Sequence, residues 1–206
     1  MSSIVVAGDT SGTITIAAPA VAGSGTLTLP VATDTLVGKA TTDTLTNKSI
    51  AATQLTGTIA ASVLPAGSVL QVVSAYYHTN QSTTSTSFVA TNLTASITPR
   101  STSSKILIIV NLASFFNTTV NGTGYWTIYR NSANIAPLGS GNAANFGSIY
   151  NTSGVVLSNS GGAYLDSPAT TASTTYTAYF SSGTGTAVQI NGNAGNSNIT
   201  LMEIAG

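Results

Sequence analysis

The sequence predicts an all-β protein with a short N-terminal β-meander arm, an extended connector and an antiparallel β-sandwich head that is jelly-roll-like. Three observations support this prediction. Apolar and polar residues alternate with a period of two along most of the chain, which is typical of strands with one covered face. Signals for helices are nearly absent. All aromatic residues lie between Tyr76 and Phe180, so a segment without rings precedes a segment that carries them.

Residues 1–40 form the predicted arm. Threonine alternates with branched aliphatic residues at positions 11–16 (SGTITI) and again at 24–29 (SGTLTL), which predicts two short strands. Each aromatic ring can bury about 150–250 Å², and a small sheet without rings lacks the burial that independent stability requires. We therefore expect a partner to cover the aliphatic side chains of the arm. The candidate anchoring residues are Ile4, Val5, Val6, Ile14, Ile16, Leu27 and Leu29.

Residues 41–66 are predicted to form the connector. Their aliphatic residues are spaced in a way that fits neither a strand nor a heptad repeat. The spacing suits an extended chain that winds around symmetry mates, in which Leu45, Ile50, Leu55 and Ile59 meet their copies at an axis. A flexible linker rich in threonine and alanine would have a similar composition, so the sequence leaves both interpretations open.

Residues 67–206 form the predicted head, where the alternation carries rings and is interrupted by polar loops such as residues 80–87. The run from Ile106 to Val110 is apolar on both faces and predicts a central strand that is covered on each side. This number and spacing of strands is typical of an antiparallel sandwich. Strands are expected at residues 68–78, 88–98, 104–116, 124–131, 146–150, 154–166, 174–181, 186–191 and 197–204.

The composition argues against several classes of partner. Charged residues make up 5% of the chain, compared with about 25% in typical proteins. The basic residues are isolated and the net charge is zero, so we do not expect binding to nucleic acid. No apolar run approaches about 18 residues, so we expect no membrane insertion. The absence of cysteine removes disulfides and thiolate metal sites.

Neither enzymatic activity nor a cofactor or metal is expected. The single histidine, His78, has no cysteine or acidic residue near it in sequence that would support a general base. Glycoside hydrolysis needs two facing carboxylates, and the head contains only Asp166 and Glu203. We expect Asp166 to accept backbone N–H groups in a turn. Glu203 is expected to pair with Arg130 or Lys105 across strands.

Several segments resemble proteins of tailed-bacteriophage virions. Residues 17–30 (AAPAVAGSGTLTLP) and 33–36 (TDTL) are similar to the N-terminal segment of many phage fibre and virion proteins, and 42–50 (TDTLTNKSI) resembles a stretch that often follows it. Residues 54–59 (QLTGTI) and 65–73 (PAGSVLQVV) resemble the collar-like junction ahead of fibre heads. The head is similar to tip domains of marine and cyanobacterial phage fibres at residues 104–107 (SKIL), 128–130 (IYR), 164–168 (YLDSP), 174–176 (TTY) and 199–204 (ITLMEI).

The resemblance implies a homotrimeric fibre or decoration protein on the surface of a phage particle, anchored by its arm to a capsid or tail protein. One alternative is a host receptor-binding tail fibre adhesin whose tyrosine rings stack on a surface polysaccharide, although most such rings are expected to fill the core or the trimer axis. Another is a secreted C1q/TNF-like trimeric ligand, which should carry a signal sequence that the first residues do not show. The candidate glycan-contacting residues are Tyr76, Tyr77, Tyr150 and Tyr164.

Overall fold

The computed structural model describes most of the head and part of the N-terminal region. The described residues are 3–7, 10–17, 24, 49–51, 53, 56, 57, 63–135, 145–152, 154 and 157–206. The chain divides into two units, Met1–Thr56 and Gly57–Gly206. Strands make up 56% of the structure and helical turns 3%, which confirms the predicted all-β class.

The first unit contains a β-hairpin of β1 (Ser3–Ala7) and β2 (Thr13–Ala17). The two strands are antiparallel, with Ile4 opposite Ile16 and Val6 opposite Ile14. The sequence repeat predicts β2 but not β1, because residues 4–6 form a continuous aliphatic run rather than an alternation. The other strand expected in the arm, residues 24–29, lies outside the described residues except for position 24.

The second unit contains every strand that the alternation predicts in the head. Two further strands, β4 and β8, are only three and two residues long and lie in segments rich in turn-forming residues, so the alternation does not reveal them. The elements are β3 (Val69–Tyr77), β4 (Gln81–Thr83), β5 (Val89–Ile97), β6 (Lys105–Asn117), β7 (Thr123–Arg130), β8 (Ala133–Asn134), β9 (Gly147–Tyr150), β10 (Ser158–Asp166), β11 (Thr174–Ser182), β12 (Val188–Ile190), a 3₁₀ turn (Gly192–Ala194) and β13 (Ser197–Ile204).

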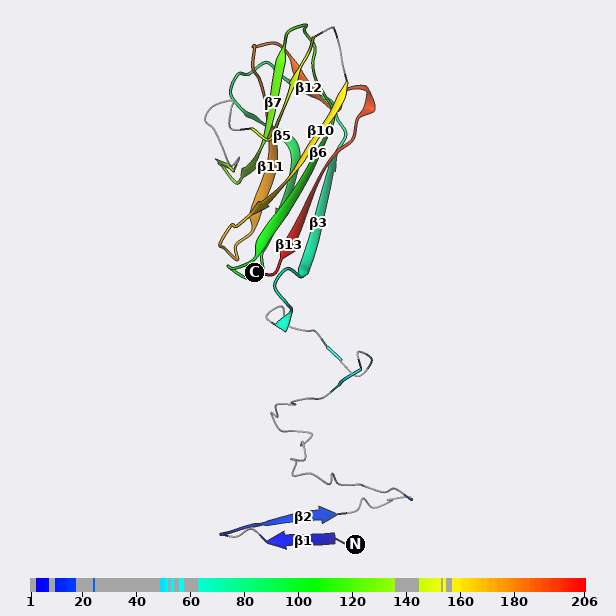
Figure 1. The fold of residues 1–206 in the computed structure, drawn as a ribbon, viewed down its shortest axis with the longest axis vertical. Coiled ribbons are helices and arrows are strands. Elements are labelled where there is room, and N and C mark those ends of the chain that lie inside the picture. Colours follow the sequence, from blue (N-terminus) through cyan, green and yellow to red (C-terminus); the bar gives the residue numbers. More distant parts are fainter. Residues whose placement is uncertain are drawn as a thin grey trace. The chain divides into compact units, whose positions relative to one another are not determined.

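These strands form two antiparallel sheets in a sandwich-like arrangement (Figure 1). The first sheet has the order β3–β13–β6–β10, and the last residues of β6 pair with β12, which in turn pairs with β4. The second sheet has the order β5–β11–β7, and both β8 and β9 pair with β7. All the pairings are antiparallel, as the sequence predicts.

The core lies between the two sheets and is built from alternate residues of each strand. Ile106 and Ile108 of β6 are fully buried from the first sheet, and Trp126, Tyr176 and Phe180 are fully buried from the second. The prediction that β6 is a central strand is correct, since it pairs with β13 on one side and β10 on the other. The expected cover on both of its faces is not seen within the described chain: from Lys105 to Leu112 only every second residue is buried, and consecutive residues are buried only near the end of the strand.

Trp126 joins the two sheets at the centre of the core. Its indole N–H donates a hydrogen bond to the Ser160 hydroxyl of β10 at 2.7 Å, and its ring stacks on Phe146 with ring centroids 5.8 Å apart. Gly147 makes this position possible, because a Cβ atom there would overlap the indole nitrogen. Glycine is therefore required beside the largest side chain of the core.

Strand β6 is bent near its end by an irregularity at Ser114. This residue has a φ of 47°, which is unusual for a residue other than glycine, and the register between β6 and β10 shifts between Ser158 and Ser160. Such bulges bend a strand and increase its twist. Beyond the bend, Phe116 and Asn117 pair with β12, so the first sheet curls at this end.

The chain enters and leaves the head at the same end. The Gly67 N–H donates to the Ala205 carbonyl at 2.8 Å, and the Ala205 N–H donates to the Ser68 carbonyl at 2.8 Å. Figure 1 accordingly shows the C-terminus beside the start of β3. We call this end the base of the head, and the opposite end, where β6 ends and β7 begins, the tip.

Candidate functional site

The hairpin of the arm exposes its aliphatic side chains. Ile4, Val5, Val6 and Ile16 are 67%, 58%, 54% and 51% exposed. Because alternate residues of a strand share a face, Ile4, Val6 and Ile16 lie on one face of the hairpin and Val5 on the other. Ile14 lies opposite Val6 in β2. The hairpin therefore presents apolar side chains on both of its faces.

The other residues predicted for the arm and connector are only partly described. Ile50 is 46% exposed. Leu27 and Leu29 of the arm, and Leu45, Leu55 and Ile59 of the connector, lie outside the described residues. The prediction that connector residues meet at an axis therefore stays a prediction.

The four candidate tyrosines do not gather at one place. Tyr76 on β3 and Tyr150 on β9 are largely exposed. Tyr77 and Tyr164 are half-buried and pack against the core, and the Tyr164 ring meets Phe146 edge-on with ring centroids 5.4 Å apart. The rings that could stack on a sugar are therefore those of Tyr76 and Tyr150, which come from different sheets.

Tyr150 borders a small pocket at the tip. The pocket has a volume of about 180 Å³, below the about 300–1,000 Å³ of typical ligand sites. Its amides hold the tip loops together: Asn151 Nδ2 donates to the Asn117 carbonyl at 2.9 Å, and Asn117 Nδ2 donates to the Thr123 carbonyl at 3.2 Å. The Tyr150 hydroxyl lies 3.1 Å from Asn121 Oδ1. The pocket thus offers one exposed ring beside amides that already stabilise the fold.

The outer face of the second sheet carries hydroxyl groups and a tyrosine pair that sequence reasoning missed. The rings of Tyr129 and Tyr179 stack with centroids 3.8 Å apart, and the hydroxyls of Thr94 and Thr177 lie 2.9 Å apart. Burial, and then the neighbouring Tyr179, raises the pKa of Tyr129. These residues alternate correctly within each strand, but only the register between strands brings them together.

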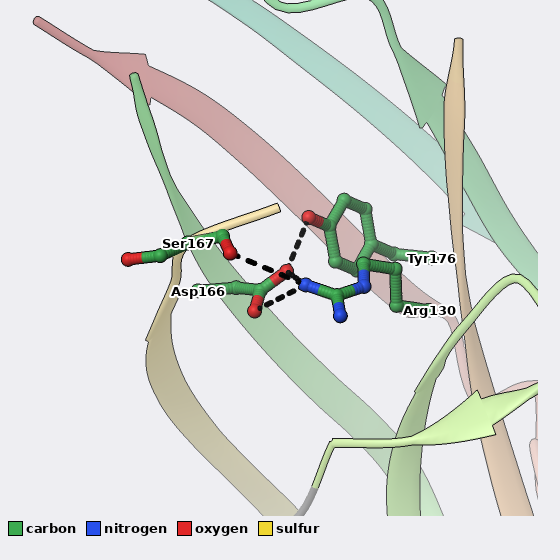
Figure 2. Close-up of polar contacts among 4 residues, drawn as sticks. All are labelled: Arg130, Asp166, Ser167 and Tyr176. Atoms are coloured by element: carbon green, nitrogen blue, oxygen red, sulfur yellow. Dashed lines mark hydrogen bonds and ion pairs between the residues drawn. The ribbon is translucent and has the colours of Figure 1, made fainter. Parts of the chain in front are cut away.

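Asp166 links the two sheets through side-chain contacts (Figure 2). Arg130 Nη1 on β7 lies 2.9 Å from each carboxylate oxygen of Asp166, and the Tyr176 hydroxyl on β11 donates to Asp166 Oδ2 at 2.7 Å. Burial, and then the hydrogen bond to Asp166, raises the pKa of Tyr176 far above its ordinary value. We expected backbone N–H groups as the donors to Asp166. The structure instead supplies two side-chain donors from the opposite sheet.

Glu203 is fully buried near the base, and the expected pairing with Arg130 or Lys105 is wrong. Its carboxylate accepts hydrogen bonds from Gln71 Nε2 and from the Arg100 backbone N–H, each at 2.6 Å. Burial alone would raise the pKa of Glu203, but the neighbouring Ser104 hydroxyl and these two donors outweigh burial and lower it. The Ser104 hydroxyl is buried, and no partner lies in full hydrogen-bond geometry to it within the described part of the chain.

The residues that the structure describes contain no group of three or more histidine, cysteine or acidic side chains that could hold a metal ion. No helix among them is long and apolar enough to cross a membrane. No protein-family model matches the sequence, and no curated protein matches it. The function is therefore inferred from the exposed surfaces and from the resemblance of the sequence segments.

The Glu203 contacts predict a dependence of stability on pH. A carboxyl group whose pKa is lower in the folded than in the unfolded state stabilises the fold above the unfolded value and loses this contribution in acid. The free energy of unfolding of the wild type should therefore exceed that of Glu203→Gln at neutral pH, and the difference should shrink as the pH falls below about 4.5, the ordinary pKa of the side chain. Urea unfolding at several pH values measures this difference. A difference that stays constant into acid would contradict the prediction.

Proposed function

We propose that this protein is a structural component of a bacteriophage virion, a homotrimeric fibre or decoration protein whose N-terminal arm anchors it and whose head is displayed outward. The observation that carries the proposal is the hairpin of β1 and β2, which exposes aliphatic side chains on both faces. Together with the resemblance of residues 17–50 to phage attachment segments, this surface supports a role in docking.

An isolated hairpin of this kind needs a partner for physical reasons. A two-stranded sheet is marginally stable at best in water, and it leaves unpaired N–H and C=O groups along its edges. Covering a Val or Ile side chain contributes about 1.5–3 kcal/mol relative to full exposure. A capsid or tail protein that covers Ile4, Val6 and Ile16, or that adds a strand to an edge of the hairpin, would supply the missing contacts.

The head is suited to display. The order β3–β13–β6–β10 in one sheet and β5–β11–β7–β9 in the other supports an eight-stranded jelly roll, a fold found in viral capsid proteins. Because the chain enters the head at the base, the tip loops lie at the end of the head farthest from this entry. This arrangement supports the proposal that the head projects from the particle.

A second candidate function is a host receptor-binding adhesin. The exposed Tyr150 ring beside the tip pocket is the observation that favours it, because sugars stack on exposed rings. Calorimetric titration with host surface polysaccharide, compared between the wild type and Tyr150→Ala, separates this function from a purely structural one. If the protein is such an adhesin, the wild type should bind the polysaccharide and Tyr150→Ala should bind it more weakly.

Removing residues 1–40 tests the anchoring role. The truncated protein should keep its folded head, with an unchanged circular dichroism spectrum in the β region, but should be absent from phage particles. Antibody labelling of particles, viewed by electron microscopy, measures incorporation and shows whether the capsid or the tail carries the protein. Incorporation at the wild-type level would refute the anchor.

A matched pair of full-length variants refines this test. Ile4→Asp places a charge on the face that also carries Val6 and Ile16, and should reduce incorporation strongly, because the charge would be buried without a partner. Thr15→Asp places the same charge on the other face of the hairpin, opposite Val5. Incorporation that is lost with the first variant and kept with the second would show which face docks.

A further inference from the structure

The outer face of the first sheet carries an apolar band that crosses all four of its long strands. Val72 of β3 lies opposite Met202 of β13, Met202 lies opposite Leu107 of β6, and Leu107 lies opposite Leu165 of β10. Figure 1 shows these four strands side by side. The residues between them in each strand face the core, so all four side chains point outward. Val72 and Leu165 are about half exposed.

The band continues toward the base and ends toward the tip. Ile109 adds an apolar side chain one row above Leu107, where Thr200 and Ser74 are its neighbours on β13 and β3, and Ile204 adds one in the row below Met202. Farther toward the tip, Asn111 lies opposite Asn198, and the face becomes polar. We define the apolar band as Val72, Leu107, Ile109, Leu165, Met202 and Ile204.

The band is nearly free of charge. Among the described residues of this face, Lys105 is the charged one, and it lies at the base margin opposite Ile204. The acidic groups of these strands, Asp166 and Glu203, point into the sandwich, where they are hydrogen-bonded. Two identical faces that meet would therefore bring together no like charges except at the margin.

The opposite outer face has a different chemistry. The corresponding positions of the second sheet are occupied by hydroxyl and tyrosine side chains, such as Thr94, Thr177 and Tyr179, which suit contact with water. The outer face of the first sheet thus carries an apolar band, whereas that of the second sheet carries hydroxyl and tyrosine side chains. This contrast indicates that the first face is covered in the assembled protein and the second is not.

We propose that the apolar band is the surface through which the heads of three copies of this chain pack around a common axis. The inference rests on the proposed trimeric virion protein and assigns its interface. Because every copy enters its head at the base, the axis must run roughly along the strands, so that all the connectors leave at one end. A three-fold axis across the strands would instead point the three bases in different directions, each a third of a turn from the next.

The size of the band fits this role. Four strands about 4.8 Å apart and three rows of outward side chains about 6.8 Å apart give a face of about 400 Å², in which the row through Leu107 is apolar on all four strands. This is the size of the largest apolar patches on monomers, which are often functional, and about half of the roughly 800 Å² that each partner gives to a standard interface. Val69 and Tyr76, exposed on the same edge strand, flank the band and enlarge the surface.

A charge in the middle of the band tests the proposal. Full-length wild type should have three times the 20.6 kDa chain mass in solution by light scattering, whereas Leu107→Lys should be a monomer. Thr177→Lys is the matched control, because it places the same charge on a central strand of the opposite face and should remain a trimer. A Leu107→Lys protein that stays trimeric would overturn the assigned interface.

A second measurement does not depend on disrupting the protein. The chain has no cysteine, so Met202→Cys and Thr177→Cys each introduce a single thiol. In trimers, Met202→Cys should react with a maleimide at least tenfold more slowly than Thr177→Cys. If the wild type is a trimer and the two thiols react at equal rates, the assigned interface is wrong although the trimer stands. A monomeric wild type would refute both the interface and the proposed trimer. The arm truncation tests anchoring independently of these outcomes.

Discussion

Replacing Trp126 with alanine should lower the free energy of unfolding of the head by about 3–5 kcal/mol, the cost usually measured for removing a large buried ring. Trp126 is fully buried, it stacks on Phe146, and it donates a hydrogen bond to Ser160 across the sandwich. The substitution therefore opens a cavity and also leaves the Ser160 hydroxyl without its donor. Urea unfolding followed by circular dichroism measures the loss, because the variant has no tryptophan left to report fluorescence.

Two controls separate volume from hydrogen bonding. Trp126→Phe keeps most of the ring volume but removes the donor, and should cost less than the alanine variant. Tyr150→Ala removes a ring of comparable size that is 59% exposed, and should cost less than about 1 kcal/mol. If Tyr150→Ala destabilised the head as much as Trp126→Ala, the assignment of Trp126 to the centre of the core would be untenable.

Replacing Asp166 with alanine should lower the free energy of unfolding by about 3 kcal/mol. The change removes the acceptor of both Arg130 and Tyr176, and the loss of one partner from a buried ion pair costs about 3–5 kcal/mol. The expected cost is at the lower end of this range because Arg130 is 31% exposed and can turn toward water. The buried Tyr176 hydroxyl cannot do so, and it would remain without its acceptor.

A double-mutant cycle tests the origin of this loss. In a Tyr176→Phe background no hydroxyl is left unpaired. The loss of unfolding free energy caused by Asp166→Ala should therefore be smaller than in the wild type, by at least about 1 kcal/mol. Chemical denaturation of the four proteins gives the coupling free energy. Strictly additive effects would mean that the hydrogen bond from Tyr176 to Asp166 contributes nothing to stability.

The strands of the head could be predicted from the sequence because each strand is a local pattern. The alternation along β5 and β13, with every second residue buried, is visible in the sequence without any knowledge of the fold. The bend at Ser114 could not be predicted, because serine has no preference for a positive φ and the bend depends on pairing with β12. The short strand β4 likewise exists only because β12 pairs with it.

The surfaces and clusters were harder to predict because they depend on register between distant strands. Arg130, Asp166 and Tyr176 come from three strands, and nothing in their sequence spacing indicates that they meet. The apolar band has the same origin, since Leu107 and Met202 are neighbours only through the pairing of β6 with β13. The exposed aliphatic residues of β1 and β2 were predictable, because a segment without aromatic rings has little to bury them against.

The pairing of Gly67 and Ser68 with Ala205 has a consequence for how the molecule can vary. Every loop at the tip is an internal connection between strands whose other ends are fixed, such as the segment from Asn117 to Thr123 between β6 and β7. Insertions or deletions there alter the distal surface without moving the base, where the chain enters the head at Gly67. A lineage can thus acquire a new outermost surface while the entry to the head keeps its geometry.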